Sequence, residues 1–101
     1  MDREKLLKEI KKFKKKLPFE TKIIVFGSRI KGQHREDSDI DLLVISEHFR
    51  GVKFNKRMPI MYDYWDIEFP VDFLCYTPEE FEEKTKHFTI AKTAQQEGVV
   101  V

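Results

Sequence analysis

Residues 23–46 read IIVFGSRIKGQHREDSDIDLLVIS, and this stretch predicts much of the fold of the chain. An apolar run opens it and another closes it, and both have the β-branched and aliphatic composition typical of buried strands. Between the runs lie a glycine, a serine, basic side chains and an acidic cluster of Asp37, Asp39 and Asp41. Crowded carboxylates repel one another unless a cation lies between them. The stretch therefore predicts two strands joined by a segment with a chemical role.

The remainder of the chain predicts alternating helices and strands. Residues 3–16 have apolar side chains at helical spacing, with Asp2 as the expected N-cap and Pro18 beyond the end. The sequence TPEEFEEKTKHF, residues 77–88, opens a helix with a capping box formed by Thr77 and Glu80. The other expected elements are strands over 22–26, 40–46 and 69–76, a short helix or turn over 28–32, a loop over 47–57, a helix over 89–96 with Gly98 as its glycine C-cap, and an edge strand over 99–101. Residues 58–65 fit either a helix or irregular structure.

These elements predict an α/β (α+β) fold in which helices pack on a mixed sheet. With 101 residues we expect one domain over 1–101. The composition is globular, with 41% apolar and 37% charged residues, and no apolar run reaches the roughly 18 residues of a membrane span. No signal peptide is visible, and Cys75 is a single cysteine in an apolar run. A cytoplasmic protein is the expectation.

The net charge of +1 is unevenly distributed along the chain. Residues 1–16 hold eight Lys or Arg against three Asp or Glu, whereas residues 61–101 hold three against nine. A basic segment can mark a nucleic-acid surface. No aromatic residue lies among the lysines of the first helix, so we favour a solvated helix face over direct nucleic-acid binding. The aromatic residues Tyr62, Tyr64, Trp65 and Phe69 fit a core, or a partner surface if they are exposed.

Gly27 and Ser28 follow a predicted strand and begin a turn. Backbone N–H groups and a hydroxyl can converge there on an anion, which predicts a phosphate site. Gly27 and Gly32 have the glycine spacing of a P-loop, but Gln33 and His34 stand where that motif requires Lys and Ser or Thr. The P-loop is thereby excluded.

Asp39 and Asp41 are two residues apart, so both carboxylates project from one face of an extended strand. Asp72 lies within the apolar sequence FPVDFLCY, where we expect a buried carboxylate that needs a partner. Hard divalent cations such as Mg²⁺ take carboxylate oxygens and leave positions open for substrate phosphates. A site with two metal ions would satisfy the three aspartates. Taken alone, the sequence DSD over 37–39 also fits a plain turn between two strands.

The string GSRIKGQHREDSDIDLLV, with a later aspartate in a strand, resembles the signature of the polymerase-beta-like nucleotidyltransferase superfamily. It is similar in particular to the minimal nucleotidyltransferases. The resemblance implies that Gly27 and Ser28 bind nucleotide phosphates and that Asp39, Asp41 and Asp72 are catalytic residues that ligate two Mg²⁺ ions. In the family, Arg often precedes the second glycine of the turn, and here Lys31 has that place.

The activity implied is transfer of a nucleoside monophosphate, AMP from ATP being the expectation, to a hydroxyl acceptor. Asp72 would be either the general base or the ligand of the metal that activates the hydroxyl. Minimal nucleotidyltransferases are typically paired with a small helical HEPN-type protein in toxin–antitoxin systems, so the resemblance implies such a partner. A non-catalytic module that binds a nucleotide or masks a partner stays open as the alternative. No residue pattern identifies the base, the acceptor or an oligomeric state.

Overall fold

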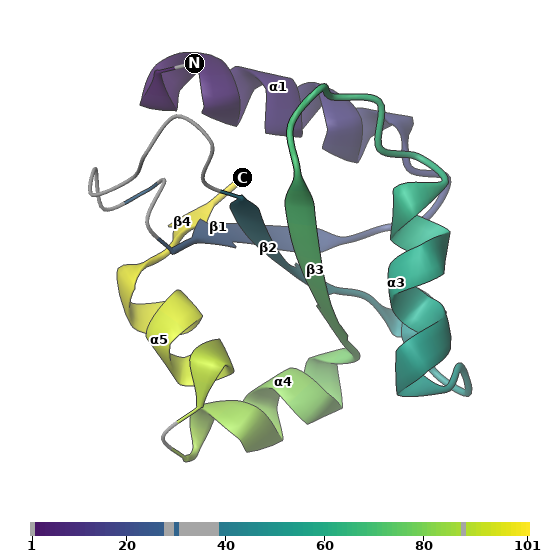
Figure 1. Cartoon of the computed structure of the whole chain (residues 1–101). Helices are drawn as coiled ribbons and strands as arrows, with labels where there is room; N and C mark the ends of the chain where they lie inside the picture. The colour runs from purple at the N-terminus through teal and green to yellow at the C-terminus, as the bar shows by residue number, and fades with distance from the viewer. Residues whose placement is uncertain (1, 28–29, 31–38, 88) are drawn as a thin grey trace.

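The structure is a computed structural model, and it describes residues 2–27, 30, 39–87 and 89–101. Helices and strands alternate along most of the described chain (Figure 1). The elements are α1 (Arg3–Lys16), β1 (Lys22–Phe26), β2 (Ile40–Ile45), the 3-10 turn η1 (Glu47–Phe49), α3 (Phe54–Tyr62), β3 (Val71–Tyr76), α4 (Pro78–Thr85), α5 (Ile90–Glu97) and β4 (Val99–Val100). The expected short helix or turn over 28–32 lies outside the described residues, apart from residue 30.

The described strands form one four-stranded mixed sheet in the order β3-β2-β1-β4. β1 pairs antiparallel with both β2 and β4, whereas β2 pairs parallel with β3. A parallel pair needs a crossover connection, and the segment with η1 and α3 provides it. The expected mixed sheet and α+β class are confirmed, and the predicted edge strand at residues 99–101 is found as β4.

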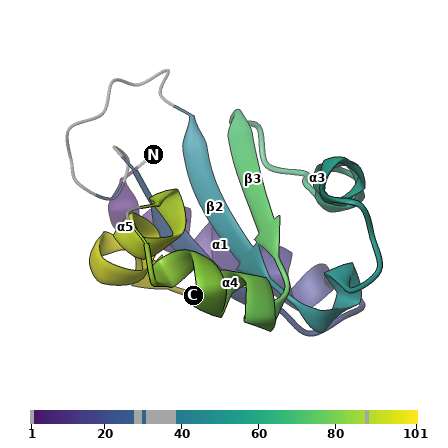
Figure 2. The ribbon, with the colours of Figure 1, turned by 90° about the horizontal axis from the view of Figure 1, so that it is seen from below.

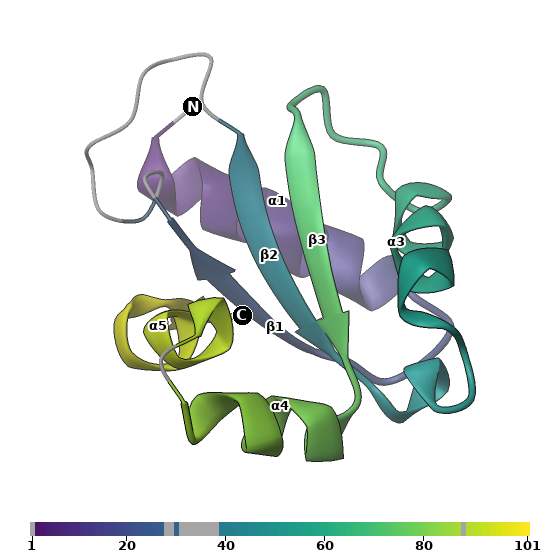
Figure 3. The same cartoon turned by 60° about the horizontal axis from the view of Figure 1, so that its bottom comes forward.

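Helices cover both faces of the sheet (Figures 2 and 3). On one face α1 buries Leu6, Ile10 and Phe13 in a core cluster with alternate residues of the strands. On the other face Ala91 and Ala94 of α5 are buried in a second cluster with alternate residues of β1 and β2. Since successive side chains in a strand point to opposite faces, the residues between the α1-facing positions of β2 and β3 face the side of α5.

Helix α3 corrects one expectation and decides between the two alternatives for part of another segment. The loop predicted over 47–57 ends earlier, because the helix begins at Phe54, and the ambiguous segment after it is helical to Tyr62. Polar side chains and Pro59 interrupt the helical spacing of apolar residues in this segment. The tertiary contacts of Arg57 and Met61, which α3 buries, outweigh the weak local preference.

Arg57 holds the crossover helix to the sheet and to α4. Its guanidinium donates to the backbone carbonyls of Val52 at 2.9 Å and Cys75 at 3.2 Å, and to the Glu80 carboxylate at 2.5 Å. Glu80 also accepts a hydrogen bond from the Thr77 backbone N–H, which completes the predicted capping box of α4. The pairing with Arg57 lowers the pKa of Glu80. Arg57 therefore joins α3 directly to β3 and, through the Glu80 carboxylate, to α4.

Gly98 caps α5 as expected, but it lacks the left-handed conformation that is usual for a glycine at the end of a helix. Its φ of −81° and ψ of 170° are extended, not left-handed. A Cβ at this position would overlap the side chain of Ile24 and the carbonyl oxygen of Ala94. The glycine is needed for close approach of the chain to β1.

Among the described residues, no helix combines the length and the apolar character that crossing a membrane requires.

Candidate active site

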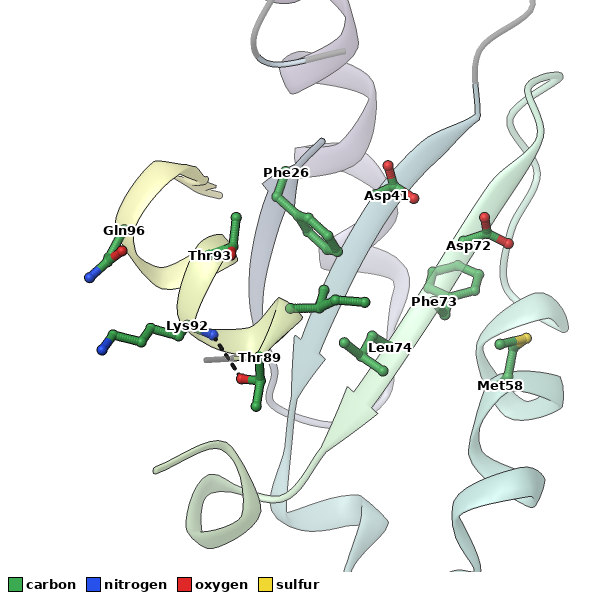
Figure 4. Close-up of a pocket in the computed structure, with 11 residues that line it drawn as sticks. Phe26, Asp41, Met58, Asp72, Phe73, Leu74, Thr89, Lys92, Thr93 and Gln96 are labelled. Atoms are coloured by element: carbon green, nitrogen blue, oxygen red, sulfur yellow. Dashed lines mark hydrogen bonds between the residues drawn. The ribbon is translucent and has the colours of Figure 1, made fainter. Parts of the chain in front are cut away.

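Asp41 and Asp72 lie directly opposite each other on neighbouring parallel strands. The register of β2 and β3 pairs Asp41 with Asp72, between the apolar pairs Ile40 with Val71 and Leu42 with Phe73. Both aspartates occupy the alternate positions that face the side of α5, and Figure 4 shows their carboxylates at the same end of the sheet. The parallel pairing thus brings together two residues that are 31 positions apart in the sequence.

Asp39 completes the predicted set but stands just outside the sheet. It is exposed and precedes β2, whose first residue is Ile40. Within the described part of the chain, no group of three or more His, Cys, Asp or Glu side chains is arranged to hold a metal ion. The structure therefore brings Asp41 and Asp72 together as a register pair, with Asp39 two residues upstream of Asp41.

The three carboxylates nevertheless interact electrostatically. Burial raises the pKa of Asp41 first, and the negative charges of Asp72 and Asp39 raise it further. The pKa of Tyr62 is raised as well, mainly by burial and then by Asp72 and Asp39. A negative potential therefore extends across this end of the sheet and favours a cation.

Burial of these aspartates differs from the expectation. Asp72 was expected to be the desolvated carboxylate because its sequence neighbours are apolar, but its side chain is exposed, whereas Asp41 is half-buried. Val71 and Phe73 are buried on the opposite face of the sheet. Strand alternation explains the error, since an apolar run with a polar residue in its middle presents that residue to the other face.

Gly27 lies against Asp41 and has a backbone conformation that favours glycine. Its φ is +86°, in the left-handed region. A Cβ built at Gly27 would overlap Oδ2 of Asp41 and lie 3.1 Å from its Cγ. The Gly27 carbonyl accepts a hydrogen bond from the Ile30 backbone N–H at 3.2 Å, as in a tight turn. Ser28, the second residue of the predicted phosphate site, lies outside the described residues.

The donor set fits a hard divalent cation such as Mg²⁺. Asp41 and Asp72 present carboxylate oxygens, which are ligands that Mg²⁺ prefers, and Asp72 is open to solvent. Burial, followed by the charges of Asp72 and Asp39, raises the pKa of Asp41, and a cation beside this carboxylate would favour its charged form.

Sequence reasoning missed a role for Tyr62 beside Asp72. The Tyr62 hydroxyl donates to the Val71 carbonyl at 2.5 Å, and its ring packs edge-on against Phe73 with centroids 5.1 Å apart. These contacts hold the residues on both sides of Asp72. The sequence signal was only an aromatic residue in an ambiguous segment. Trp65, by contrast, is a core residue that packs on Phe13 and Phe73.

The aspartate pair lies in a groove of about 800 Å³ on the α5 side of the sheet (Figure 4). The groove is lined by residues of three neighbouring strands, among them Phe26 of β1, Asp41 of β2 and Asp72 of β3. Helix α5 forms one wall, and Met58 of α3 lines the other side. This volume lies in the range of small-molecule sites in proteins. The charged end of the groove suits a phosphate ester with its cation.

Comparisons with known proteins identify the family of the chain. The nucleotidyltransferase domain family matches residues 3–101. A solved structure described as a "putative nucleotidyltransferase from Sulfolobus solfataricus" is similar, with 26% identity and a TM-score of 0.58 over 78% of this chain and 70% of that chain. A second solved chain with a nucleotidyltransferase description has 24% identity and a TM-score of 0.49, over 80% of this chain and 88% of that one. No curated protein gave a match. Because the family match spans nearly the whole chain, this protein belongs to the nucleotidyltransferase domain family.

Proposed function

We propose that this protein transfers a nucleoside monophosphate, AMP from ATP, to a hydroxyl acceptor in a reaction that depends on Mg²⁺. The observation that carries the proposal is the position of Asp41, opposite Asp72 across a parallel strand pair and in contact with the left-handed turn at Gly27. A turn that can approach phosphate and a pair of carboxylates that can hold its cation are thereby adjacent.

Each residue has a distinct role in the proposed reaction. Gly27 and Ser28 would contact the phosphates, and Asp39, Asp41 and Asp72 would hold two Mg²⁺ ions. When bound, Mg²⁺ supplies charge neutralisation on the triphosphate and a lower pKa for the acceptor hydroxyl. Asp72 is exposed and so open to the acceptor, whose proton it receives if it is the general base.

The bond changes balance without a further reactant. The acceptor oxygen forms a bond to the α-phosphorus, and the bond from that phosphorus to the bridging oxygen of the β-phosphate breaks. Pyrophosphate takes the electron pair and leaves, and the hydroxyl proton passes to Asp72 or to solvent.

We also propose that the acceptor hydroxyl belongs to a partner protein of the HEPN type, as the resemblance implies for an antitoxin-like chain. An exposed apolar stripe on α3 supports a protein partner. Phe54, Met58 and Tyr62 are 54%, 38% and 42% exposed and recur every four residues, so they share one helix face. Met58 also lines the groove that holds Asp72, which connects the stripe with the proposed acceptor side.

The test is incubation of the protein with MgCl₂ and each of the four labelled ribonucleoside triphosphates, with and without the protein that co-purifies with it. We expect label from ATP on the partner, lost on addition of EDTA, with stoichiometric pyrophosphate. Glu82→Gln, an exposed carboxylate of α4 away from the groove, is the matched control and should transfer like the parent. A partner that is neutralised without any label, from any triphosphate, would instead support the non-catalytic binding module.

A further inference from the structure

A second groove, of about 1050 Å³, lies at the other end of the sheet from the aspartate pair. In the register of β1 with β2, Phe26 pairs with Asp41 at one end and Lys22 with Ile45 at the other. Lys22 and Ile45 line the second groove, about 13 Å of strand away from the first pair. Figure 3 shows the start of β1 and the end of β2 together at the lower end of the sheet. None of the described residues lines both grooves, so each groove can hold its own ligand.

Helix α1 presents its lysines to two different surroundings. Lys8 and Lys12 pair with glutamates of the same helix, at 3.7 and 3.4 Å. Lys11 and Lys15 line the second groove together with Lys22 of β1, and all three are exposed. No ion pair joins these three lysines to another residue that the structure describes. Their charges are available to an external anion.

Carboxylates lower the positive charge of the second groove but do not cancel it. Glu47 lines the groove, yet its carboxylate accepts hydrogen bonds from Arg50 at 2.7 and 2.9 Å. Glu20 also lines the groove and is exposed. Lys14 contributes a fourth ammonium group, which donates to the Val101 carbonyl at 2.9 Å. With four lysines, two glutamates and the histidine counted as neutral, the lining has a net charge of +2.

An aromatic ring is held beside these lysines. His48 stacks on Phe19, with ring centroids 3.9 Å apart and an interplanar angle of 2°, and both residues line the second groove. Phe19 in turn packs edge-on against the buried ring of Phe49, at 6.3 Å. The backbone N–H of His48 donates to the Ser46 hydroxyl at 3.1 Å. Since His48 is exposed and Phe19 is half-buried, the imidazole is the outer layer of the stack.

We infer that the second groove binds single-stranded nucleic acid, with phosphates on Lys11, Lys15 and Lys22 and a base stacked on His48. The inference does not depend on the proposed transfer reaction, because none of these residues lies at the aspartate pair. The sequence argued against direct nucleic-acid binding because no aromatic residue lies among the lysines of the first helix. The fold places His48 and Phe19 beside those lysines from other parts of the chain.

The chemistry of the lining favours a single strand over the other phosphate ligands. A positively charged groove with an aromatic ring for stacking is the combination by which proteins bind single strands without sequence preference. In a duplex the bases are already stacked and paired, so a side chain of the protein cannot stack on them. A free nucleotide has phosphate at one position only, whereas the lysines lie on both α1 and β1 and can contact successive phosphates of a strand.

The test is fluorescence anisotropy of a short labelled oligouridine with the full chain, in EDTA and over a range of KCl concentrations. The double variant Lys11→Gln with Lys15→Gln removes two phosphate contacts, so the slope of log K against log salt should become shallower by about 1.4. Lys8→Gln with Lys12→Gln is the matched control, because it removes the same charge from the same helix outside the groove, and it should keep the parent slope.

The stacking ring is tested separately from the charges. His48→Ala should weaken oligouridine binding by about 5- to 100-fold and leave the salt slope unchanged. His87→Ala removes an exposed histidine that does not line the groove, and it should bind like the parent. A duplex of the same length should bind the parent more weakly than the single strand.

Four results would overturn the inference. The first is a parent protein that does not bind oligouridine. The second is an equal loss of slope in the two double lysine variants, which would indicate diffuse attraction to α1 instead of a site. The third is parent-like affinity of His48→Ala, or equal binding of duplex and single strand, either of which would leave an anion site without a base platform. The fourth is AMP binding as tight as that of oligouridine, which would make a free nucleotide the ligand.

Discussion

Replacing Gly27 by alanine should separate the cost of its backbone conformation from its role beside Asp41. The φ of +86° is unfavourable for any residue with a Cβ, at a cost of about 1–2 kcal/mol in the folded state. The new methyl group would also overlap Oδ2 of Asp41, so this carboxylate has to rotate away from its position. We therefore expect two losses, one in stability and one in Mg²⁺-dependent ATP binding of about 10- to 100-fold.

Gly51→Ala is the matched control for this variant. Gly51 also has a left-handed φ, +78°, but a Cβ there would meet nothing within 4 Å. Both variants should lose about 1–2 kcal/mol in urea unfolding, with a Tm lower by about 4–8 °C per kcal/mol. Only Gly27→Ala should lose ATP affinity in calorimetry. Parent-like binding by Gly27→Ala, or an equal loss in Gly51→Ala, would refute the contact between the turn and Asp41 as the basis of the site.

Three further predictions concern stability and reactivity. Folding raises the pKa of Asp41 above 3.8, so the native protein binds more protons than the unfolded chain. The free energy of unfolding should therefore fall as the pH rises through that raised pKa. Asp41→Asn should therefore raise the Tm of the metal-free protein at pH 7 more than at pH 4, and a lower Tm at pH 7 would contradict this. Arg57→Met leaves the carbonyls of Val52 and Cys75 without their donor and should lower the free energy of unfolding in urea by about 2–4 kcal/mol. Glu80→Gln keeps a side chain suited to the capping box and should lower it by less. Equal losses in the two variants would show that the ion pair dominates. Burial raises the pKa of Cys75 to about 12, so DTNB at pH 8 should label it only as the protein unfolds in urea, and rapid labelling of the native protein would argue against its burial.

The sequence predicted those elements whose local signals agree with their tertiary setting. Helix α1 has a cap, a spacing of apolar residues and a following proline that all indicate one helix, and the structure has it over Arg3–Lys16. The capping box at Thr77 was likewise found where predicted. For α3 local signals were weak, and the helix depends on Arg57, whose partners Cys75 and Glu80 are 18 and 23 residues away.

The sequence proposed residues for the candidate site, but it could not predict how they are arranged. The spacing of Asp39 and Asp41, the apolar neighbours of Asp72 and the family resemblance suggested these three candidates. The pairing of Asp41 with Asp72 depends on the parallel register of β2 and β3, which is not a local property. Asp72 is exposed, contrary to expectation, because strand alternation places it on the face opposite to Val71 and Phe73. The wall formed by α5 was also missed, because Gln96 and Thr93 have no signal in the sequence until the helix is placed beside the groove.

The most direct test of the central claim is a comparison of the parent protein with Asp72→Asn, with ATP affinity and AMP transfer measured on the same preparations. Asp41 and Asp39 would still hold the cation of the triphosphate, so we predict that the variant keeps most of its ATP affinity in MgCl₂. It should lose AMP transfer to the co-purifying partner, detected by mass spectrometry, by at least 100-fold, because the acceptor hydroxyl is no longer activated. Equal AMP incorporation by the parent and Asp72→Asn would contradict the account.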